Sequence, residues 1–483
     1  MYAGRLDLRP VFLITGLLLT ILALTMLVPA GVAWASGYGG EGVFAASAAV
    51  TFFAGGTLVL ASRVGFFRLS LRQAFMLTTA IWIVLPAFAA LPFVFSETAL
   101  SYTDAFFEAM SGLTTTGSTV IVGLESVGPG VLFWRALLQW LGGIGIILTA
   151  LLVLPALGIG GMQMFRVEAI DAHERLVPRV TALGMGLVGI YIVFTALWAL
   201  LLWLAGLSGF DAVVHAMTTL STGGFSTSDR SIAAFDDPVV ELVLVAGMIT
   251  GSLPFFLYLQ AVHGAPRMLL RDTQVRTFLA TLGGAIVLVF GWLWLVLDHP
   301  LLHAARMALF TTTSVISGTG YILGDFWQWG GLAGAILFFL ATMGGCAGSS
   351  TCAIKVFRFQ ILYATAKTQV AKLIQPHGIF IPYYNYRPIP EGMSDAVLGF
   401  FFLYAGVLAI VSLLLSFSGL DFENAFSIAA MALSNVGQGR GGVCLPFAQL
   451  PDATKWILSA TMLVGRLEMF SVLVLFLPTF WKK

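Results

Sequence analysis

The chain has 483 residues, of which 59% are hydrophobic and only 10% are charged. A soluble globular domain carries about 25% charged residues. With a mean hydropathy of +0.95, this chain has more apolar surface than a soluble fold of its size can bury. The net charge of +1 favours neither a nucleic-acid-binding protein nor an acidic disordered chain. The composition predicts an integral membrane protein.

Apolar stretches recur along the whole chain, and an α-helix needs about 20 apolar residues to cross a bilayer. The candidate spans are residues 10–34, 44–62, 73–95, 131–154, 182–204, 238–260, 277–297, 330–342, 396–417 and 453–477. Eighteen of the 24 Lys and Arg residues fall in loops on one side if the N-terminus is cytoplasmic. The positive-inside rule therefore predicts that both termini are cytoplasmic.

Four of the outward loops share one pattern, a short apolar segment that ends in small and hydroxyl residues with a glycine. They read DAFFEAMSGLTTTGS (104–118), DAVVHAMTTLSTGGF (211–225), MALFTTTSVISGTGY (307–321) and NAFSIAAMALSNVGQ (424–438). When they are aligned on Gly117, Gly224, Gly320 and Gly437, alanine stands 12 positions earlier and a hydroxyl residue three positions earlier in every copy. Ordinary loop composition explains one such segment, but not four in register.

This repeat predicts an all-α, polytopic membrane protein. Two leading helices precede four fused units, each made of a helix, a short re-entrant helix with an extended strand, and a second helix, around one pseudo-fourfold pore. The predicted boundaries are 1–72 for the leading helices and 73–165, 166–262, 263–375 and 376–483 for the four units.

Extended backbone at membrane depth is tolerated where it lines a watery cavity or is buried in protein. Four such strands around one axis direct rings of carbonyl oxygens at one line, and such rings replace the water shell of a monovalent cation such as potassium. Glycine permits the backbone angles required, and the C-terminal ends of the short helices favour a cation. The predicted carbonyl donors to K⁺ are Thr115, Thr116, Gly117, Thr222, Gly223, Gly224, Gly318, Thr319, Gly320, Asn435, Val436 and Gly437.

The segments TTTGS, STGGFS, SGTGY and SNVGQG resemble the superfamily of potassium transporters that comprises the Trk, Ktr and HKT proteins. The resemblance covers essentially the whole chain, and the two leading helices are most like the Trk-type membrane subunit of the bacterial potassium uptake system. It implies potassium uptake across the bacterial cytoplasmic membrane by a homodimer embedded in lipid. It also implies a cytoplasmic regulatory subunit that binds nucleotides. K⁺ is then the transported ion, and we expect no organic cofactor and no nucleic acid.

Glycines and small hydroxyl residues interrupt the eighth candidate span at 344–353, which favours an unwound segment that is able to move. In the family that the chain resembles, such a loop closes the pore below the filter and a pore-facing arginine contacts it. By this resemblance, the expected gate residues are Gly344, Gly345, Gly348 and Arg466. Two alternatives remain open: helix packing through small residues, and a pairing of Arg466 with Glu468.

Two other classes of protein fit the sequence less well. A secondary transporter of a small organic solute, with broken mid-membrane helices, predicts an inverted twofold repeat. The four copies here have the same orientation. A membrane-embedded enzyme needs clustered Asp, Glu or His residues in its helices, and within the candidate spans there is little beyond Glu241, Arg466 and Glu468. We therefore do not expect an enzyme.

The charges divide between the two faces of the membrane. The inner side carries 18 basic and 7 acidic residues, and the outer loops and pore entrances carry 5 basic and 14 acidic ones. Acidic residues near the predicted filter mouths are Glu125, Asp229, Asp236, Asp237 and Asp325. An acidic entrance concentrates cations in front of a neutral carbonyl filter.

Overall fold

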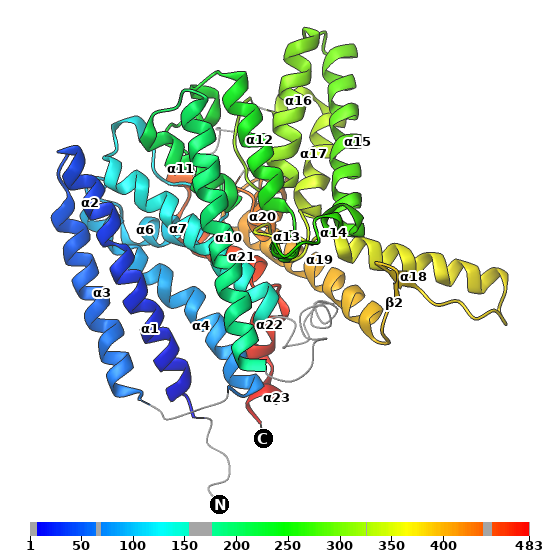
Figure 1. The fold of residues 1–483 in the computed structure, drawn as a ribbon, viewed down its shortest axis with the longest axis horizontal. Coiled ribbons are helices and arrows are strands. Elements are labelled where there is room, and N and C mark those ends of the chain that lie inside the picture. The colour runs from blue at the N-terminus through cyan, green and yellow to red at the C-terminus, as the bar shows by residue number, and fades with distance from the viewer. Residues whose placement is uncertain (1–6, 64–68, 154–175, 325, 438–446, 483) are drawn as a thin grey trace, which may run out of the picture.

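The structure is a computed structural model that describes residues 7–63, 69–153, 176–324, 326–437 and 447–482. Within these ranges the regular structure is helical apart from one antiparallel hairpin, in which β1 (Tyr383–Tyr384) pairs with β2 (Arg387–Pro388). Figure 1 shows the helices as a wide array, with α1 to α3 at one edge and α15 to α17 at the opposite edge.

Two leading spans open the chain, as predicted. The first is formed by α1 (Arg9–Thr25) with α2 (Leu27–Ser36), and the second by α3 (Glu41–Ala61). They cross closely because Gly16 and Gly55 face one another: a Cβ on either residue would lie 2.8 Å from the other's carbonyl oxygen. Small residues at such crossings let helix backbones approach within a membrane.

The remaining helices follow in four groups, each with a short helix in its middle. The first group is α4 (Leu71–Ala89), α5 (Leu91–Phe95), α6 (Tyr102–Leu113), η1 (Leu124–Ser126), α7 (Pro129–Leu148) and η2 (Thr149–Val153). The second is α10 (Leu176–Leu204), α11 (Gly209–Leu220), η3 (Ser231–Ala234), α12 (Pro238–Ser252) and α13 (Phe255–Val262). The third is α14 (Arg267–Arg271), α15 (Thr273–Leu295), α16 (Leu301–Ile316), η4 (Phe326–Trp329), α17 (Gly331–Met343) and α18 (Val356–Ile374). The fourth is α19 (Met393–Phe417), α20 (Phe422–Ser434), η5 (Phe447–Gln449), α21 (Asp452–Arg466), α22 (Phe470–Leu473), η6 (Val474–Phe476) and α23 (Pro478–Trp481).

Among the described residues, seven helices are long and apolar enough to cross a membrane. Two further candidate spans are broken, which corrects their prediction as continuous helices. The pair α12 and α13 bends by 93°, and α21 bends by 108° against Phe470–Phe476. Pro254 explains the first break, because the residue before a proline avoids helical angles and Leu253 is extended (φ −92°, ψ 156°). At the second break Glu468 and Met469 have positive φ angles of 57° and 49°.

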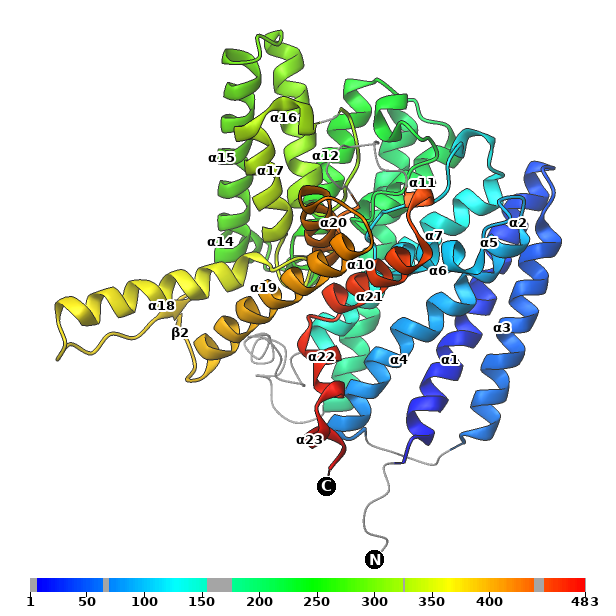
Figure 2. The same ribbon diagram turned by 180° about the vertical axis from the view of Figure 1, so that it is seen from behind.

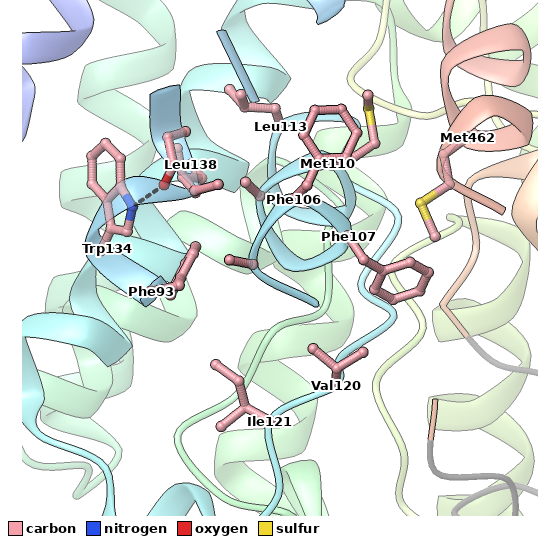
Figure 3. Packing of buried hydrophobic residues seen from close by; sticks show 14 of the residues in the cluster. Phe93, Phe106, Phe107, Met110, Leu113, Val120, Ile121, Trp134, Leu138 and Met462 are labelled. Atoms are coloured by element: carbon pink, nitrogen blue, oxygen red, sulfur yellow. Dashed lines mark hydrogen bonds between the residues drawn. The ribbon is translucent and has the colours of Figure 1, made fainter. Parts of the chain in front are cut away.

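The short helix α6 is packed on both sides by other elements. In Figure 3, Phe106, Phe107 and Met110 of α6 lie between Trp134 of α7 and Met462 of α21. Trp134 also donates a hydrogen bond from Nε1 to the carbonyl oxygen of Ala89 (3.0 Å). The first group therefore contacts the fourth directly, as a closed ring of units requires.

The two ends of the described chain lie close to the same end of the molecule. Figures 1 and 2 both show the N-terminal end of α1 and the helix α23 at the bottom of the view, while α18 and α19 project together from one side. The predicted boundaries of the four units stay predictions, and the boundary between 165 and 166 lies outside the described residues.

Candidate functional site

The four short helices end at the same position of the repeat. Three begin at a capping side chain, because Ser101, Ser208 and Asp421 each accept a hydrogen bond from the backbone nitrogen three residues later. Their last residues are Leu113, Leu220, Ile316 and Ser434, at or directly before the repeated hydroxyl position. The partly negative C-terminal end of each helix therefore meets the start of its extended strand.

The strands share an unusual backbone conformation at one position, two residues before the aligned glycine. Thr115 (φ 54°), Thr222 (φ 53°), Gly318 (φ 73°) and Asn435 (φ 53°) are all left-handed there. Positive φ is uncommon for residues other than glycine, so its presence at matched positions in four strands indicates a common backbone path. The aligned glycines follow this pattern in three strands, where Gly117, Gly224 and Gly320 have φ of 88°, 77° and 78°. Gly437 does not share it.

These strands lie directly against one another. A Cβ on Gly117 would overlap the carbonyl oxygen of Gly223, and a Cβ on Gly224 would overlap that of Thr319. A Cβ on Gly437 would lie 2.5 Å from the carbonyl carbon of Gly117. Strands of all four units therefore meet at these glycines, and a Cβ does not fit at Gly117, Gly224 or Gly437.

Most of the predicted carbonyl donors have no hydrogen-bond partner within the part of the chain that the structure describes. Buried backbone carbonyls are nearly always paired, so a cluster of free ones is a site for a cation or water. The carbonyls that no hydrogen bond reaches are those of Thr115, Thr116, Gly117, Thr222, Gly224, Gly318, Thr319, Asn435 and Val436. The Gly223 carbonyl differs, because it accepts a hydrogen bond from Gln139 Nε2 (2.7 Å).

Gln139 of α7 is a positioning residue that sequence reasoning missed. Besides its bond to Gly223, its Oε1 accepts a hydrogen bond from the backbone nitrogen of Phe225 (3.1 Å). The side chain is completely buried, and the absence of a Cβ at Gly223 leaves the space that it fills. The available signal was a carboxamide inside a mostly apolar span, one turn after Arg135.

A buried ion pair holds the C-terminal ends of the first two strands. Glu108 of α6 accepts hydrogen bonds from Arg135 Nε (2.8 Å), Thr119 Oγ1 (2.9 Å) and the Val120 nitrogen (2.9 Å). Arg135 also donates to the carbonyl oxygen of Ser226 in the second strand (3.0 Å). Both charged side chains are at most 1% exposed. They are compensated by one another, by these strand atoms and, for Arg135, by the Phe225 ring at 4.1 Å.

Replacing Glu108 with alanine should therefore destabilise the protein strongly. Removal of one partner leaves the Arg135 charge buried and uncompensated, which typically costs about 3–5 kcal/mol. We expect a large fall in the melting temperature of the purified protein in detergent. The double variant Glu108→Ala/Arg135→Ala should lose less than the sum of the single variants. Additive losses would show that the pair does not act as a unit.

Glycines of the second helices support the ends of the short helices in three of the units. A Cβ on Gly142 or Gly465 would overlap the carbonyl oxygen of Leu113 or Leu433, and a Cβ on Gly251 would lie 2.7 Å from that of Leu220. The three leucines are equivalent in the repeat, because each stands four residues before the aligned glycine of its unit. Nothing in the sequence distinguishes these glycines from the other glycines of the apolar helices.

The acidic residues at the outer mouth mostly brace loops. Asp229 accepts hydrogen bonds from the nitrogens of Gly123 (2.7 Å) and Leu124 (3.0 Å), and Glu125 accepts one from the Asp229 nitrogen (3.0 Å). The Ser228 hydroxyl, which donates to Glu125, lowers the pKa of that carboxyl. Further along, Arg306 bridges Asp236 and Glu241, and Asp237 caps α12. Asp325 lies outside the described residues.

The gate candidate is an irregular loop between Met343 and Val356 that lies against the second strand. Ser350 Oγ donates to the carbonyl oxygens of Leu220 (2.9 Å) and Gly251 (2.8 Å), and Thr222 Oγ1 lies 3.4 Å from Ser350 Oγ. The loop is also tied to the break after α12, where the Cys346 nitrogen donates to the carbonyl oxygen of Ser252 (3.1 Å). Gly344 and Gly348 are left-handed (φ 71° and 78°), and a Cβ on Gly345 would lie 2.6 Å from Thr351.

Arg466 contacts this loop. Its Nη1 lies 3.4 Å from the carbonyl oxygen of Ser350 and contacts Cys352 Sγ, and its Nη2 donates to the carbonyl oxygen of Gly142 (2.9 Å). The side chain is 1% exposed. The alternative of a pairing with Glu468 is not observed, because Glu468 instead pairs with Lys355 (3.3 Å) and Arg358 (2.5 Å).

Glu468 lies in a buried charge cluster. Its partners Lys355 and Arg358, which the charge pattern assigns to the cytoplasmic side, are only 2% and 0% exposed. Arg358 also donates to the carbonyl oxygen of Ile354 (2.7 Å) and stacks over Phe400, 3.7 Å from the ring centre. The two basic residues and Glu468 form a buried cluster that joins the end of the loop to the break after α21.

Comparisons with known proteins show the family and the fold of this chain. Residues 40–483 match the family model TrkH, described as a cation transport protein. The Trk system potassium uptake protein TrkI of Halomonas elongata is 41% identical, over 85% of this chain and 84% of the relative. The Trk system potassium uptake protein TrkH of Escherichia coli K12 is 36% identical, over 98% of this chain and 99% of the relative. The crystal structure of the potassium transporter TrkH from Vibrio parahaemolyticus superposes with a TM-score of 0.92, at 35% identity, over 99% of this chain and 100% of that one.

The fold and the matches together define a multi-pass membrane protein of the cation-transport class. The chain belongs to the TrkH family of cation transport proteins.

Proposed function

We propose that this protein takes up potassium ions through the cluster formed by its four extended strands. The observation that carries the proposal is the set of unpaired carbonyl oxygens on four strands that meet at their aligned glycines. Such oxygens replace the hydration shell of a monovalent cation. The strands contribute no carboxylate, which favours a weakly held monovalent ion over a divalent one. The relatives named as potassium uptake proteins support K⁺ as the ion.

The direction of uptake follows from the distribution of charge. The N-terminal end of α1 and α23 share one end of the molecule (Figure 2), and the basic loops favour the cytoplasm for that end. The protein then resides in the bacterial cytoplasmic membrane, with the acidic loops around Glu125 and Asp229 facing outward. A negative mouth raises the local concentration of cations.

The loop 344–353 and Arg466 form the proposed gate. The loop reaches the first residue of the second strand through Ser350 and Thr222, and Arg466 adds a positive charge that repels a cation in a low-dielectric path. Opening requires that the bonds of Ser350 to α11 and α12 break while the loop moves. Gly344, Gly345 and Gly348 supply the backbone freedom for that movement.

Substitution of Ser350 by alanine should favour the open gate. The variant loses the hydroxyl whose single proton the Leu220 and Gly251 carbonyls share, while the Ser350 nitrogen still donates to the Gly251 carbonyl. The loss is worth about 1 kcal/mol. We expect about a five- to tenfold rise in ⁸⁶Rb⁺ uptake by proteoliposomes that lack any regulator. Ser349→Ala is the matched control, because Ser349 Oγ bonds only within the loop, to Cys346 and Thr351. Equal uptake by the two variants would argue against a role of the Ser350 hydroxyl in keeping the gate closed.

The assembly is proposed as a homodimer in lipid that works with a cytoplasmic, nucleotide-binding regulatory subunit. Relatives are named as components of a Trk system, which supports a multi-part assembly. We assign no catalytic role to the chain. Within the described residues, no group of three or more His, Cys, Asp and Glu side chains is arranged to hold a metal ion.

Growth of a potassium-uptake-deficient bacterium tests this function against the organic-solute alternative. Expression of the chain should restore growth on low potassium, together with rapid net K⁺ uptake after potassium depletion. The variant Gly189→Leu, on an exposed face of α10, should behave like the parent. Restored growth without net K⁺ uptake, or no rescue by protein that reaches the membrane, would contradict the proposal.

A further inference from the structure

A cavity of about 390 Å³ lies between α1, α4 and α7 and reaches Leu113 at the end of α6. Its lining is aliphatic and aromatic apart from two threonines, Thr78 and Thr149. Both hydroxyls already donate to carbonyl oxygens of their own helices, at 2.8 Å each. These groups therefore have no need of water, and an apolar cavity of this kind does not hold it. The volume falls in the range of small-molecule binding sites, about 300–1,000 Å³.

The shape of the cavity suits a long and narrow occupant. It follows α4 from Ala74 to Pro86, a distance of about 18 Å at 1.5 Å per residue. One leaflet of a bilayer contributes half of a hydrocarbon core that is about 30 Å thick. The cavity is therefore about as long as one leaflet's acyl chains.

The cavity also continues to the surface that faces lipid. Ile21 of α1 lines it and is 53% exposed, next to the exposed residues Leu17 and Leu24 of the same helix. Both α1 and α4 belong to helices apolar enough to cross a membrane. The opening therefore faces the hydrocarbon of the membrane. The apolar molecule available to enter it is a phospholipid.

We propose that the cavity binds one acyl chain of a membrane phospholipid and thereby supports the position of Arg466. Two lining residues contact that arginine: the Trp82 ring lies 5.6 Å from its guanidinium carbon, and the Gly142 carbonyl accepts its hydrogen bond at 2.9 Å. Leu113, which also lines the cavity, is the last residue of α6 and lies just before the first strand. An acyl chain in the cavity packs behind Trp82 and α7, so that both keep their places beside Arg466.

Gly145 offers a way to fill the cavity from within. It lines the cavity, and a Cβ there would meet only Trp82, at 3.8 Å. Gly145→Leu therefore places a side chain where the acyl chain would lie. Gly189→Leu is the matched control, since the same change on α10 points into open space. Ile81→Trp fills the cavity from α4 and serves if Gly145→Leu does not fold.

The experiment uses full-length protein in liposomes that contain a phosphatidylethanolamine with a photoactivatable diazirine on one acyl chain. After irradiation, mass spectrometry of peptides locates the adducts. The diagnostic residues are Trp82 and Leu113, because they are only 7% and 4% exposed and a lipid reaches them through the cavity. We expect labelling of these two residues in the parent and in Gly189→Leu, and at least a tenfold reduction in Gly145→Leu. Labelling of the exposed Val287 and Leu288 on α15 should stay constant in all three.

Absence of label at Trp82 and Leu113 in the parent, while Val287 is labelled, would overturn the proposal. Equal label in Gly145→Leu and Gly189→Leu would overturn it as well. The measurement reports binding and does not depend on transport, so its failure would leave the proposed potassium uptake standing.

Discussion

Proteoliposomes that contain the Arg466→Ala variant should take up ⁸⁶Rb⁺ at least tenfold faster than the parent in the absence of any regulator. Arg466 is buried and lies between the loop carbonyl of Ser350 and the Gly142 carbonyl of the first unit. Its removal takes away a positive charge from the proposed path and one attachment of the loop. A tenfold change corresponds to about 1.4 kcal/mol, a modest part of the repulsion between two charges in a low-dielectric environment.

Two control variants separate the charge from other effects of the change. Arg466→Lys keeps the charge and should leak much less than Arg466→Ala. Arg230→Ala removes an exposed arginine that donates to the nearby Ala233 carbonyl, and should leave the leak unchanged. Unaltered rubidium flux in correctly folded Arg466→Ala protein would show that Arg466 is not part of the gate.

Replacement of Gly224 by serine should abolish most discrimination between potassium and sodium. The residue has a φ of 77°, where a side chain is strained, and a Cβ would overlap the Thr319 carbonyl of the third strand. The clash must displace a carbonyl of the ring or its neighbour, and a distorted ring no longer matches the size of dehydrated K⁺. We expect the ratio of K⁺ to Na⁺ competition against ⁸⁶Rb⁺ uptake to fall about tenfold or more.

Gly206→Ser is the control for backbone strain alone. Gly206 has a φ of 106°, and a Cβ there meets no atom within 4 Å. This variant should keep the parental selectivity even if its stability falls. Intact discrimination in Gly224→Ser would mean that the strands do not form the filter.

The sequence predicts those features that one local segment encodes. The position of each short helix, and the residues at which each strand begins, follow from patterns within 15 residues, because capping groups, small residues and left-handed positions act on their own neighbourhood. The four strands indeed share a left-handed residue at the position two before the aligned glycine. The loop at 344–353 follows from its own composition in the same way.

Features that join different units are beyond such reasoning. Gln139 bonds to Gly223, 84 residues later in the chain, and Arg135 of α7 bonds to Ser226 of the second unit. The break after α12 carries a signal, Pro254, that a hydropathy pattern alone overlooks. The break after α21 carries none, since Glu468 and Met469 adopt positive φ without a glycine. Only the tertiary structure pairs Glu468 with Lys355 and Arg358 rather than with Arg466.

Diffraction from crystals of the protein grown in thallium(I) tests the central claim most directly. Tl⁺ resembles K⁺ in charge and size and is located by its anomalous scattering. We expect an anomalous peak surrounded by the carbonyl oxygens of equivalent residues in the four strands, such as Thr115, Thr222, Gly318 and Asn435. An anomalous map with no peak among the four strands, from crystals in which Tl⁺ is visible elsewhere, would contradict it.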